Sequence, residues 1–232
     1  MLDFDAFEVL SFDCYGTLID WEQGILGALR PIFAMHAVTA DEAEILSAYA
    51  RFEAEVEGGE YQSYRFVLKT VLEKLGEHFG FSPSPAQIGA FVSSQRKWPP
   101  FPDAPEALRR LQGKYRIGVV SNIDRDLFVH SQRLLKVSFD WVVTASEVRA
   151  YKPSPKMFEA AIERAGVAKE KILHVAQSLY HDIAPAKAFG LTTVWVDRRK
   201  GLPGSGATPP AKATPDFEVP DLHALAEAAE CA

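Results

Sequence analysis

The stretch that decides the fold is a short apolar run that ends in a carboxylate and a glycine turn. It reads Val9-Leu10-Ser11-Phe12-Asp13-Cys14-Tyr15-Gly16-Thr17-Leu18. Its first half predicts a fully buried strand, and Asp13 stands where that strand ends. In open α/β sheets, the carboxyl ends of the strands are where ligands bind. Asp13 is therefore either a residue that caps the following turn or a nucleophile.

The composition is that of an ordinary globular protein. The chain has 232 residues, of which 47% are hydrophobic and 24% charged, and its net charge is −6. That length suffices for a sizeable core, and the acidic balance predicts no binding to nucleic acid or to an anionic membrane. No signal-peptide pattern and no membrane-spanning apolar run occur. Cys14 and Cys231 lie far apart in the sequence, which predicts no disulfide and a reducing cytoplasm.

Residues 21–97 show helical periodicity and no strand pattern. Apolar residues recur at helical spacing in four stretches, which predicts four amphipathic helices. The proline-rich segment 98–102 ends this helical part. We therefore expect one domain built from residues 1–19 and 98–232, with a compact helical domain inserted over residues 20–97.

From residue 105 onward, helical and strand patterns alternate. The predicted strands cover residues 117–120, 141–143, 172–176 and 192–196, and the predicted helices cover 106–114, 126–135, 155–165 and 183–189. Such alternation predicts a mostly parallel sheet with helices on both faces. Residues 200–214 are rich in Gly and Pro and predict a surface loop, which a last short helix over 222–229 follows.

Polar residues stand at or just after the carboxyl ends of these predicted strands. They are Asp13, Ser121, Asn122, Lys152 and Asp182, and a parallel sheet brings all these ends to one edge. The combination suggests covalent catalysis with Asp13 as nucleophile. Lys152 would keep Asp13 ionised and balance charge on a leaving group.

The other members of this set have roles that complement the nucleophile. Thr17 and nearby backbone N–H groups would hold an anionic end of the substrate, and Ser121 and Asn122 would donate hydrogen bonds to it. Asp182 would hold Lys152, bind a metal or help to activate water. Structural alternatives remain: Ser121-Asn122 as a helix cap, Lys152 in an exposed turn and Asp182 as a helix cap. A further alternative is that the protein binds a ligand without catalysis. The joint presence of Asp13, Thr17, Ser121, Lys152 and Asp182 argues against it.

Four motifs resemble those of the haloacid dehalogenase-like hydrolase superfamily. They cover residues 12–18, 120–122, 151–153 and 177–183. The helical insertion after the first motif resembles the cap domain of that superfamily. The resemblance spans essentially the whole chain and implies a Rossmann-like parallel-sheet core of the α/β class with an inserted four-helix cap.

Tyr15 indicates the reaction within that superfamily. Its phosphatases carry a second Asp two residues after the nucleophile, as general acid and base, whereas a phenol has a pKa of about 10. Asp-x-Tyr-Gly-Thr resembles the 2-haloacid dehalogenase branch, and halide needs no proton to leave. The resemblance implies that Asp13 displaces halide from a 2-haloalkanoic acid and that water hydrolyses the aspartyl ester to a 2-hydroxy acid. The alternative is a Mg²⁺-dependent phosphatase acting on a small phosphate ester.

The fourth motif bears on the metal. Gln177 stands where the phosphatases have an Asp that binds magnesium, and a neutral amide is a poor exchange for a carboxylate ligand of a hard cation. We therefore expect a reaction that requires no cofactor. Were a metal bound, Asp13, the Tyr15 carbonyl and Asp182 would hold it.

The resemblance also implies substrate contacts and partners. Substrate would be bound by the residues Tyr15, Asn122, Arg51, Gln177, Ser178 and Phe158, the last at the position of a family Tyr. Arg51 has Arg65 and Arg30 as rivals, and an exposed helix arginine is the structural alternative. Trp21, Phe52 and Tyr180 would form an apolar wall or belong to the core. The expected partners are a small anionic substrate and, because members of this fold are often dimers, a second copy of the chain.

Overall fold

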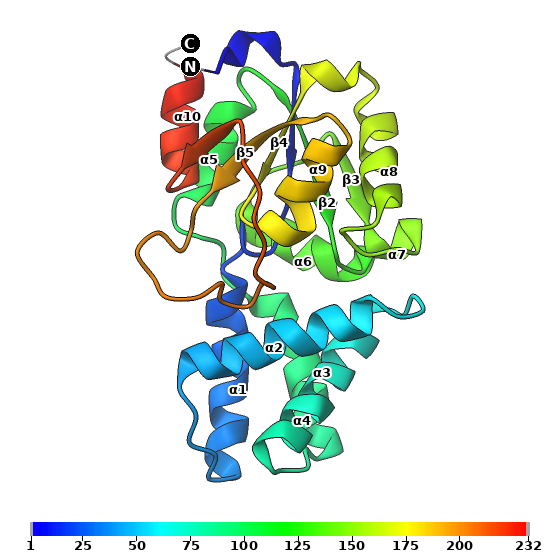
Figure 1. Ribbon diagram of the computed structural model, residues 1–232, viewed down its shortest axis with the longest axis vertical. Coiled ribbons are helices and arrows are strands. Elements are labelled where there is room, and N and C mark those ends of the chain that lie inside the picture. The colour runs from blue at the N-terminus through cyan, green and yellow to red at the C-terminus, as the bar shows by residue number, and fades with distance from the viewer. Residues whose placement is uncertain (1, 231–232) are drawn as a thin grey trace.

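The computed structural model describes residues 2–230 and shows a parallel sheet with a helical lobe beneath it (Figure 1). The sheet has six strands in the order β3-β2-β1-β4-β5-β6, all of them parallel. The strands are β1 Val9–Phe12, β2 Arg116–Ser121, β3 Trp141–Thr144, β4 Ile172–Ala176, β5 Thr192–Val196 and β6 Phe217–Val219. This order is that of a doubly wound fold, with β1 at the centre. The predicted α/β class with a Rossmann-like sheet is confirmed.

Helices cover both faces of the sheet, as the βα alternation predicts. Helices α5 (Ala104–Leu111), α6 (Arg125–Leu135) and α10 (Leu222–Glu230) contribute to the larger apolar core. Helices α8 (Pro155–Ala165) and α9 (Ala184–Ala188) contribute to a smaller one. All four residues of β1 are buried, because a central parallel strand has helices on both sides.

The helical lobe consists of α1 (Trp21–Met35), α2 (Glu42–Glu57), α3 (Tyr64–Phe79) and α4 (Pro85–Ser94). Each helix begins with a side chain that accepts a hydrogen bond from a backbone N–H of the first turn: Asp20, Asp41, Ser63 and Ser84, respectively. Such caps satisfy N–H groups that have no partner within the helix. The four helical patterns of the sequence therefore correspond to four capped helices.

Two chain segments run side by side between the sheet and the helical lobe. Asp20 N–H donates to the Pro99 carbonyl at 2.8 Å, and Phe101 N–H donates to the Leu18 carbonyl at 3.0 Å. Further hydrogen bonds join the two parts: Tyr64 N–H donates to Asp124 Oδ1 at 3.0 Å. Arg65, one of the rivals to Arg51, pairs with Asp126 at 2.5 Å and with Asp124 at 3.4 Å. The lobe is thus held against the carboxyl edge of the sheet.

The structure contains several short elements that the sequence patterns do not predict. Strand β6, helix α7 (Ala145–Val148) and the 3₁₀ turns at Phe4–Ala6, Gln95–Lys97 and Lys169–Lys171 were not predicted. The helix expected over 183–189 is a π-helical turn, Leu179–Ile183, followed by α9. Such short segments carry too little periodicity to be seen in the sequence.

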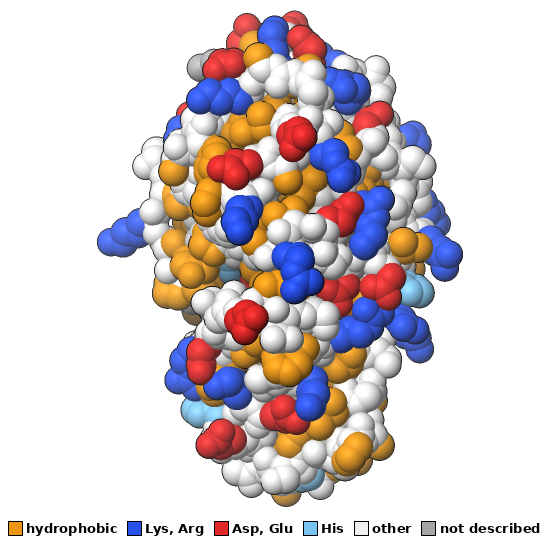
Figure 2. Space-filling view, turned by 90° about the vertical axis from the view of Figure 1, so that its right-hand side faces the viewer, with side chains coloured by type: hydrophobic (Ala, Val, Ile, Leu, Met, Phe, Trp, Pro, Cys, Tyr) orange, Lys and Arg blue, Asp and Glu red, His pale blue; other side chains and the backbone are white. Residues whose placement is uncertain are grey.

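The face of the molecule in Figure 2 shows no concentration of one charge. Basic and acidic side chains are mixed over both lobes of the face in Figure 2. Within residues 2–230, no helix is long and apolar enough to cross a membrane.

Gly118 in β2 allows a first prediction about the sheet. A Cβ atom at this position would lie 2.0 Å from the ring of Trp141 on the neighbouring strand. We expect Gly118→Ala to lower the free energy of unfolding by about 1–3 kcal/mol through overpacking, measured by urea denaturation. Gly27→Ala is the control, because α1 is exposed there and a Cβ meets nothing within 4 Å. An unchanged stability in Gly118→Ala would contradict the packing described.

Candidate active site

The turn after β1 fixes the position of Asp13. Asp13 N–H donates to the Val175 carbonyl at 3.0 Å, so the residue continues the ladder between β1 and β4. The chain then turns sharply, and Gly16 has φ +92°, a conformation that residues with a Cβ rarely adopt. The Cys14 carbonyl accepts hydrogen bonds from Leu18 and Ile19 N–H. This compact turn leaves the Asp13 side chain at the carboxyl edge of the sheet.

Lys152 joins two carboxylates from different strand ends. Its Nζ lies 2.7 Å from Asp13 Oδ1 and 2.7 Å from Asp182 Oδ1, and it also donates to the Val120 carbonyl at 3.0 Å. The other oxygen of Asp13, Oδ2, accepts a hydrogen bond from Thr17 Oγ1 at 2.7 Å. Asp13, Lys152 and Asp182 are all nearly inaccessible to solvent, with 5%, 2% and 1% exposed. The convergence predicted from the strand ends is present, and the exposed-turn alternative for Lys152 does not apply.

Burial and ion pairing have opposite effects on the pKa values of Asp13, Lys152 and Asp182. Burial raises the pKa of Asp13 above its ordinary value, although Lys152 and Thr17 counteract part of the rise. Burial alone would lower the pKa of Lys152, but the two carboxylates outweigh it and raise that pKa. For Asp182, burial is outweighed by Lys152 and His174, which hold its pKa below the usual range. The ammonium therefore stays protonated beside its carboxylates.

Two histidines support this arrangement. His174 is fully buried in β4, where its Nε2 lies 3.0 Å from Asp182 Oδ1 and its Nδ1 3.2 Å from Ser11 Oγ. His181 Nδ1 lies 3.2 Å from Ser178 Oγ, and burial lowers the pKa of His181 to about 4. At neutral pH the His181 ring is therefore uncharged.

The second motif contributes a hydroxyl without a hydrogen-bond partner, Ser121, and an amide that is bonded to protein groups, Asn122. Ser121 is fully buried, and its Oγ has no hydrogen-bond partner within the described part of the chain. Asn122 Nδ2 donates to the Lys152 carbonyl at 3.1 Å and to Glu57 Oε2 at 2.9 Å, and its Oδ1 accepts from Lys152 N–H at 2.6 Å. Asn122 therefore holds the Lys152 backbone, and Ser121 is the hydroxyl left for a ligand.

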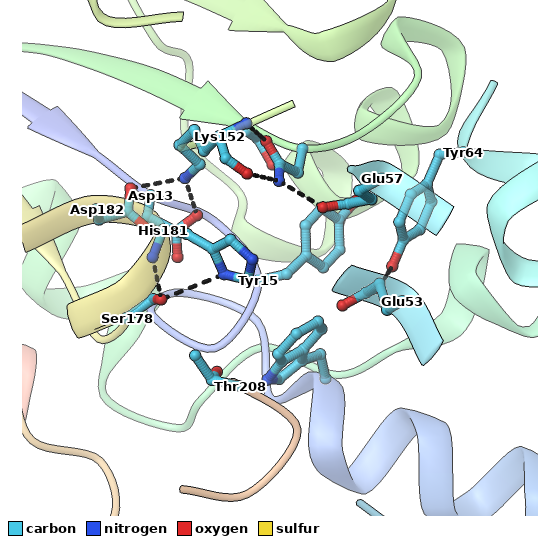
Figure 3. A pocket seen from close by; sticks show the side chains of 13 residues that line it. Asp13, Tyr15, Glu53, Glu57, Tyr64, Lys152, Ser178, His181, Asp182 and Thr208 are labelled. Carbon is cyan, nitrogen blue, oxygen red and sulfur yellow. Dashed lines mark hydrogen bonds and ion pairs between the residues drawn. The ribbon is translucent and has the colours of Figure 1, made fainter. Parts of the chain in front are cut away.

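These groups open onto one small cavity between the sheet and the helical lobe (Figure 3). Its volume is about 30 Å³, above the roughly 10–15 Å³ that one water molecule requires, so the cavity suits a small ligand. The lining residues are Asp13, Tyr15, Trp21, Glu53, Glu57, Tyr64, Ser121, Asn122, Lys152, Ser178, His181, Asp182 and Thr208.

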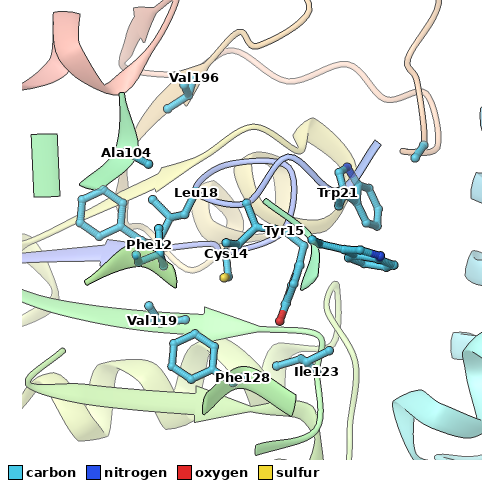
Figure 4. Packing of buried hydrophobic residues seen from close by; sticks show 14 of the residues in the cluster. Phe12, Cys14, Tyr15, Leu18, Trp21, Ala104, Val119, Ile123, Phe128 and Val196 are labelled. Carbon is cyan, nitrogen blue, oxygen red and sulfur yellow. The ribbon is translucent and has the colours of Figure 1, made fainter. Parts of the chain in front are cut away.

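Tyr15 lines the cavity but its hydroxyl is already bound. The hydroxyl lies 2.7 Å from Ser131 Oγ and accepts a hydrogen bond from Gln95 Nε2 at 2.5 Å. Burial raises the pKa of Tyr15 well above its ordinary value. Its neighbour Cys14 is fully buried with Phe12 and Leu18 in the apolar core (Figure 4), which confirms the prediction that Cys14 is a core residue.

The structure does not bring Arg51 to the cavity, so its predicted contact with substrate stays a prediction. Arg51 is exposed, stacks over the Phe52 ring at 4.5 Å and lines a separate surface hollow. The reason is its position on α2. Glu53 faces the cavity, and two residues correspond to about 200° around a helix, so Arg51 points away from it.

Phe158 and Gln177 also lie off the cavity. Phe158 is fully buried in α8 against His174 and Phe189, on the face of the sheet that α8 covers. Gln177 N–H donates to Thr17 Oγ1 at 2.9 Å, which joins the first and fourth motifs. Its side chain lines neighbouring surface pockets.

Four cavity residues were missed by the sequence reasoning. Glu53, Glu57 and Tyr64 come from α2 and α3, and Thr208 comes from the loop after β5. Glu53 had a signal, because it lies four residues after Tyr49, on the otherwise apolar face of α2. Thr208 had none, since nothing in a Gly- and Pro-rich loop shows where it folds back.

Comparisons with known proteins agree with this geometry. The family model of haloacid dehalogenase-like hydrolases matches residues 7–190. The (S)-2-haloacid dehalogenase of Pseudomonas sp. (strain YL) is 25% identical over 98% of this chain and 97% of its own length. The phosphoserine phosphatase of Thermus thermophilus is 33% identical over 66% of this chain and 61% of its own.

A solved structure supports the same fold. The L-2-haloacid dehalogenase of Xanthobacter autotrophicus with chloropropionic acid covalently bound has a TM-score of 0.79 at 22% identity, covering 97% of this chain and 98% of its own. The family model and the curated relatives confirm the predicted superfamily and the prediction that the protein is an enzyme. This chain belongs to the haloacid dehalogenase-like hydrolase family, and among its relatives it resembles the 2-haloacid dehalogenases.

Proposed function

We propose that this hydrolase displaces halide from a small 2-haloalkanoic acid, with Asp13 as the nucleophile. The observation that carries the proposal is the buried Asp13 carboxylate, which Lys152 and Thr17 hold at 2.7 Å each on the wall of the cavity. Two relatives that are 25% and 24% identical to this chain are (S)-2-haloacid dehalogenases, which supports the substrate class.

The reaction would proceed in two steps. A carboxylate oxygen of Asp13 forms a bond to the halogen-bearing carbon as the carbon–halogen bond breaks, and halide leaves with the electron pair. Water then attacks the Asp13 ester carbonyl, the 2-hydroxy acid leaves, and the Asp13 carboxylate is restored. Asp182 Oδ2 is buried and accepts no hydrogen bond within residues 2–230, which leaves it free to accept one from the attacking water and orient it.

Tyr15 supports carbon–halogen chemistry over phosphate-ester chemistry. Its hydroxyl is bound by Ser131 and Gln95, and its raised pKa prevents it from acting as a base near neutral pH, so it cannot alternate as the acid and base of phosphate-ester hydrolysis. Halide is a stable anion and leaves without a proton.

The donor set does not fit a magnesium ion. Lys152 Nζ already takes one oxygen each of Asp13 and Asp182. The fourth motif supplies an amide, Gln177, whose side chain lies outside the cavity. Nowhere in residues 2–230 do three His, Cys, Asp or Glu side chains gather as a metal site. The two steps above therefore use no metal. A Mg²⁺-dependent phosphatase is the second candidate, on the likeness to the Thermus enzyme.

A substrate comparison tests the proposed function. We expect chloride release from 2-chloropropionate in the presence of EDTA, measured with a halide assay, and no Mg²⁺-dependent release of phosphate from p-nitrophenyl phosphate. Phosphate release that requires Mg²⁺, without chloride release in any condition, would sink the dehalogenase proposal. Separate enantiomers of 2-chloropropionate show the stereochemical preference.

We propose that residues 20–97 act as a cap on the core formed by residues 1–19 and 98–232, and that Thr17, Ser121 and Ser178 help to hold the substrate. A homodimer and a cytoplasmic location follow from the family resemblance and from the cysteine content of the chain; Cys231 lies outside the described residues.

A further inference from the structure

The side of the cavity that faces the nucleophile is acidic. Glu53 and Glu57 lie one helical turn apart on α2, where residues four apart share a face. Both line the cavity, across from Asp13 and Asp182 (Figure 3). Glu53 is only 3% exposed. A pair of largely buried carboxyl groups at this place needs partners.

The partners within the protein are incomplete. Glu53 Oε1 accepts hydrogen bonds from Tyr49 at 2.9 Å and from Tyr64 at 2.8 Å. Glu57 Oε2 accepts one from Asn122, but the buried Glu57 Oε1 receives none from any described residue. A buried carboxylate oxygen without a donor is costly, and Ser121 Oγ lines the same cavity, also without a partner. Both atoms indicate that a ligand completes the site.

The charges in the cavity select the kind of ligand. Four carboxyl groups line it, those of Asp13, Asp182, Glu53 and Glu57. Among the described lining residues, Lys152 is the only Lys or Arg, and its three N–H donors already have three acceptors. A ligand carboxylate against α2 would meet two acids and no cation, which disfavours that orientation.

The protonation of the pair agrees with a missing cation. Burial raises the pKa of Glu53 to about 7, and burial together with Glu53 raises the pKa of Glu57. The groups bonded to the pair are the hydroxyls of Tyr49 and Tyr64 and the Asn122 amide. More distant groups are Lys152 and Tyr151, and Arg149 and His181 line a neighbouring pocket with Glu57. Without a ligand Glu53 is therefore partly protonated near neutral pH, and a bound cation would displace that proton.

We propose that Glu53 and Glu57 bind a protonated amine of the substrate, so that the enzyme acts on a small 2-haloacid that carries an ammonium group. An ammonium is compact and has up to three donors, which suits a cavity of this size and the free Glu57 Oε1. The inference rests on the proposed function for the bond that Asp13 breaks, whereas the amine site itself is independent of that step.

Binding tests the amine site without turnover. We expect calorimetry to show that propylammonium binds the wild-type protein. Binding should strengthen as the pH rises through about 7, because Glu53 ionises there. Glu57→Gln should weaken propylammonium binding at least tenfold. Glu55→Gln is the matched control, because Glu55 is exposed on the same helix and pairs with Lys74, and it should bind like the wild type.

Turnover tests the substrate class with two compounds that differ by one ammonium group. We expect kcat/KM for 3-amino-2-chloropropionate to exceed that for 2-chloropropionate at least tenfold, after subtraction of an enzyme-free blank, and Glu57→Gln to remove this preference. Absent propylammonium binding, or equal binding by Glu57→Gln, would overturn the amine site. A site that binds propylammonium through Glu57, in a protein that releases no chloride from either compound, would uphold the amine site and refute the proposed halide chemistry.

Discussion

Replacing Asp13 by Asn is expected to lower kcat by at least about 10⁴-fold, the scale of loss when a covalent nucleophile is removed. The fold should survive, because an amide keeps the shape of the side chain: its oxygen can accept from Lys152, and its NH₂ group can donate to Thr17 Oγ1. Asp5→Asn is the control, since Asp5 is exposed and far from the cavity. Near-normal turnover in Asp13→Asn would refute the assignment of the nucleophile.

An isotope experiment separates this covalent route from direct attack by water. In a single turnover in H₂¹⁸O, water attacks the Asp13 ester carbonyl, so the label should enter the Asp13 carboxylate. The first 2-hydroxy acid should then contain ¹⁶O from the enzyme. Mass spectrometry of the peptide containing Asp13 and of the product decides the question. Label in the first product with none in the protein would exclude the aspartyl ester.

Replacing Lys152 by Met is expected to destabilise the protein by about 3–5 kcal/mol at pH 8, because it leaves two buried carboxylates without their counter-ion. Asp13 and Asp182 are 5% and 1% exposed and share this one ammonium. Activity should be lost as well, since the pKa of Asp13 would rise further and no positive charge would remain beside the leaving halide.

The stability of the Lys152→Met variant should depend on pH, and the direction of that dependence follows from the two carboxyl groups. Without the ammonium, both carboxyl groups have folded-state pKa values above their unfolded values near 4, so the folded state binds more protons. Stability is then retained at low pH and falls as the pH rises through those raised values. Urea denaturation at pH 5 and pH 8 measures it. The control is Lys156→Met on the exposed surface of α8, with an expected change within about 0.5 kcal/mol.

The core of the site could be predicted because parallel strands impose their own geometry. Asp13, Ser121, Lys152 and Asp182 are up to 169 residues apart in sequence, yet each lies at or after the carboxyl end of a strand, and the sheet brings the ends together. Strand β5 was predicted with the bounds that the structure has, since a buried apolar run between helices has few alternatives. The short strand β6 has an exposed Glu218 among its three residues and no such pattern.

The cap side of the site could not be predicted in the same way. Which face of α2 meets the sheet depends on how the helical lobe docks, and no local pattern encodes that. A family resemblance pointed to Arg51, whereas the docked lobe presents Glu53 and Glu57. Helix periodicity alone places these residues on different faces but does not say which face the sheet covers.

The two oxygens of Glu57 affect how long a ligand stays bound to the enzyme. One of its oxygens ties the helical lobe to Asn122, and the other faces the cavity without a donor. A head group that needs a single acceptor can use the free oxygen while the tie to Asn122 stays in place. A guanidinium, which favours both oxygens of a carboxylate, would compete with Asn122 and loosen the lobe. The residence time of a cationic ligand should therefore depend on how many hydrogen bonds its head group makes to Glu57, and not on its charge alone.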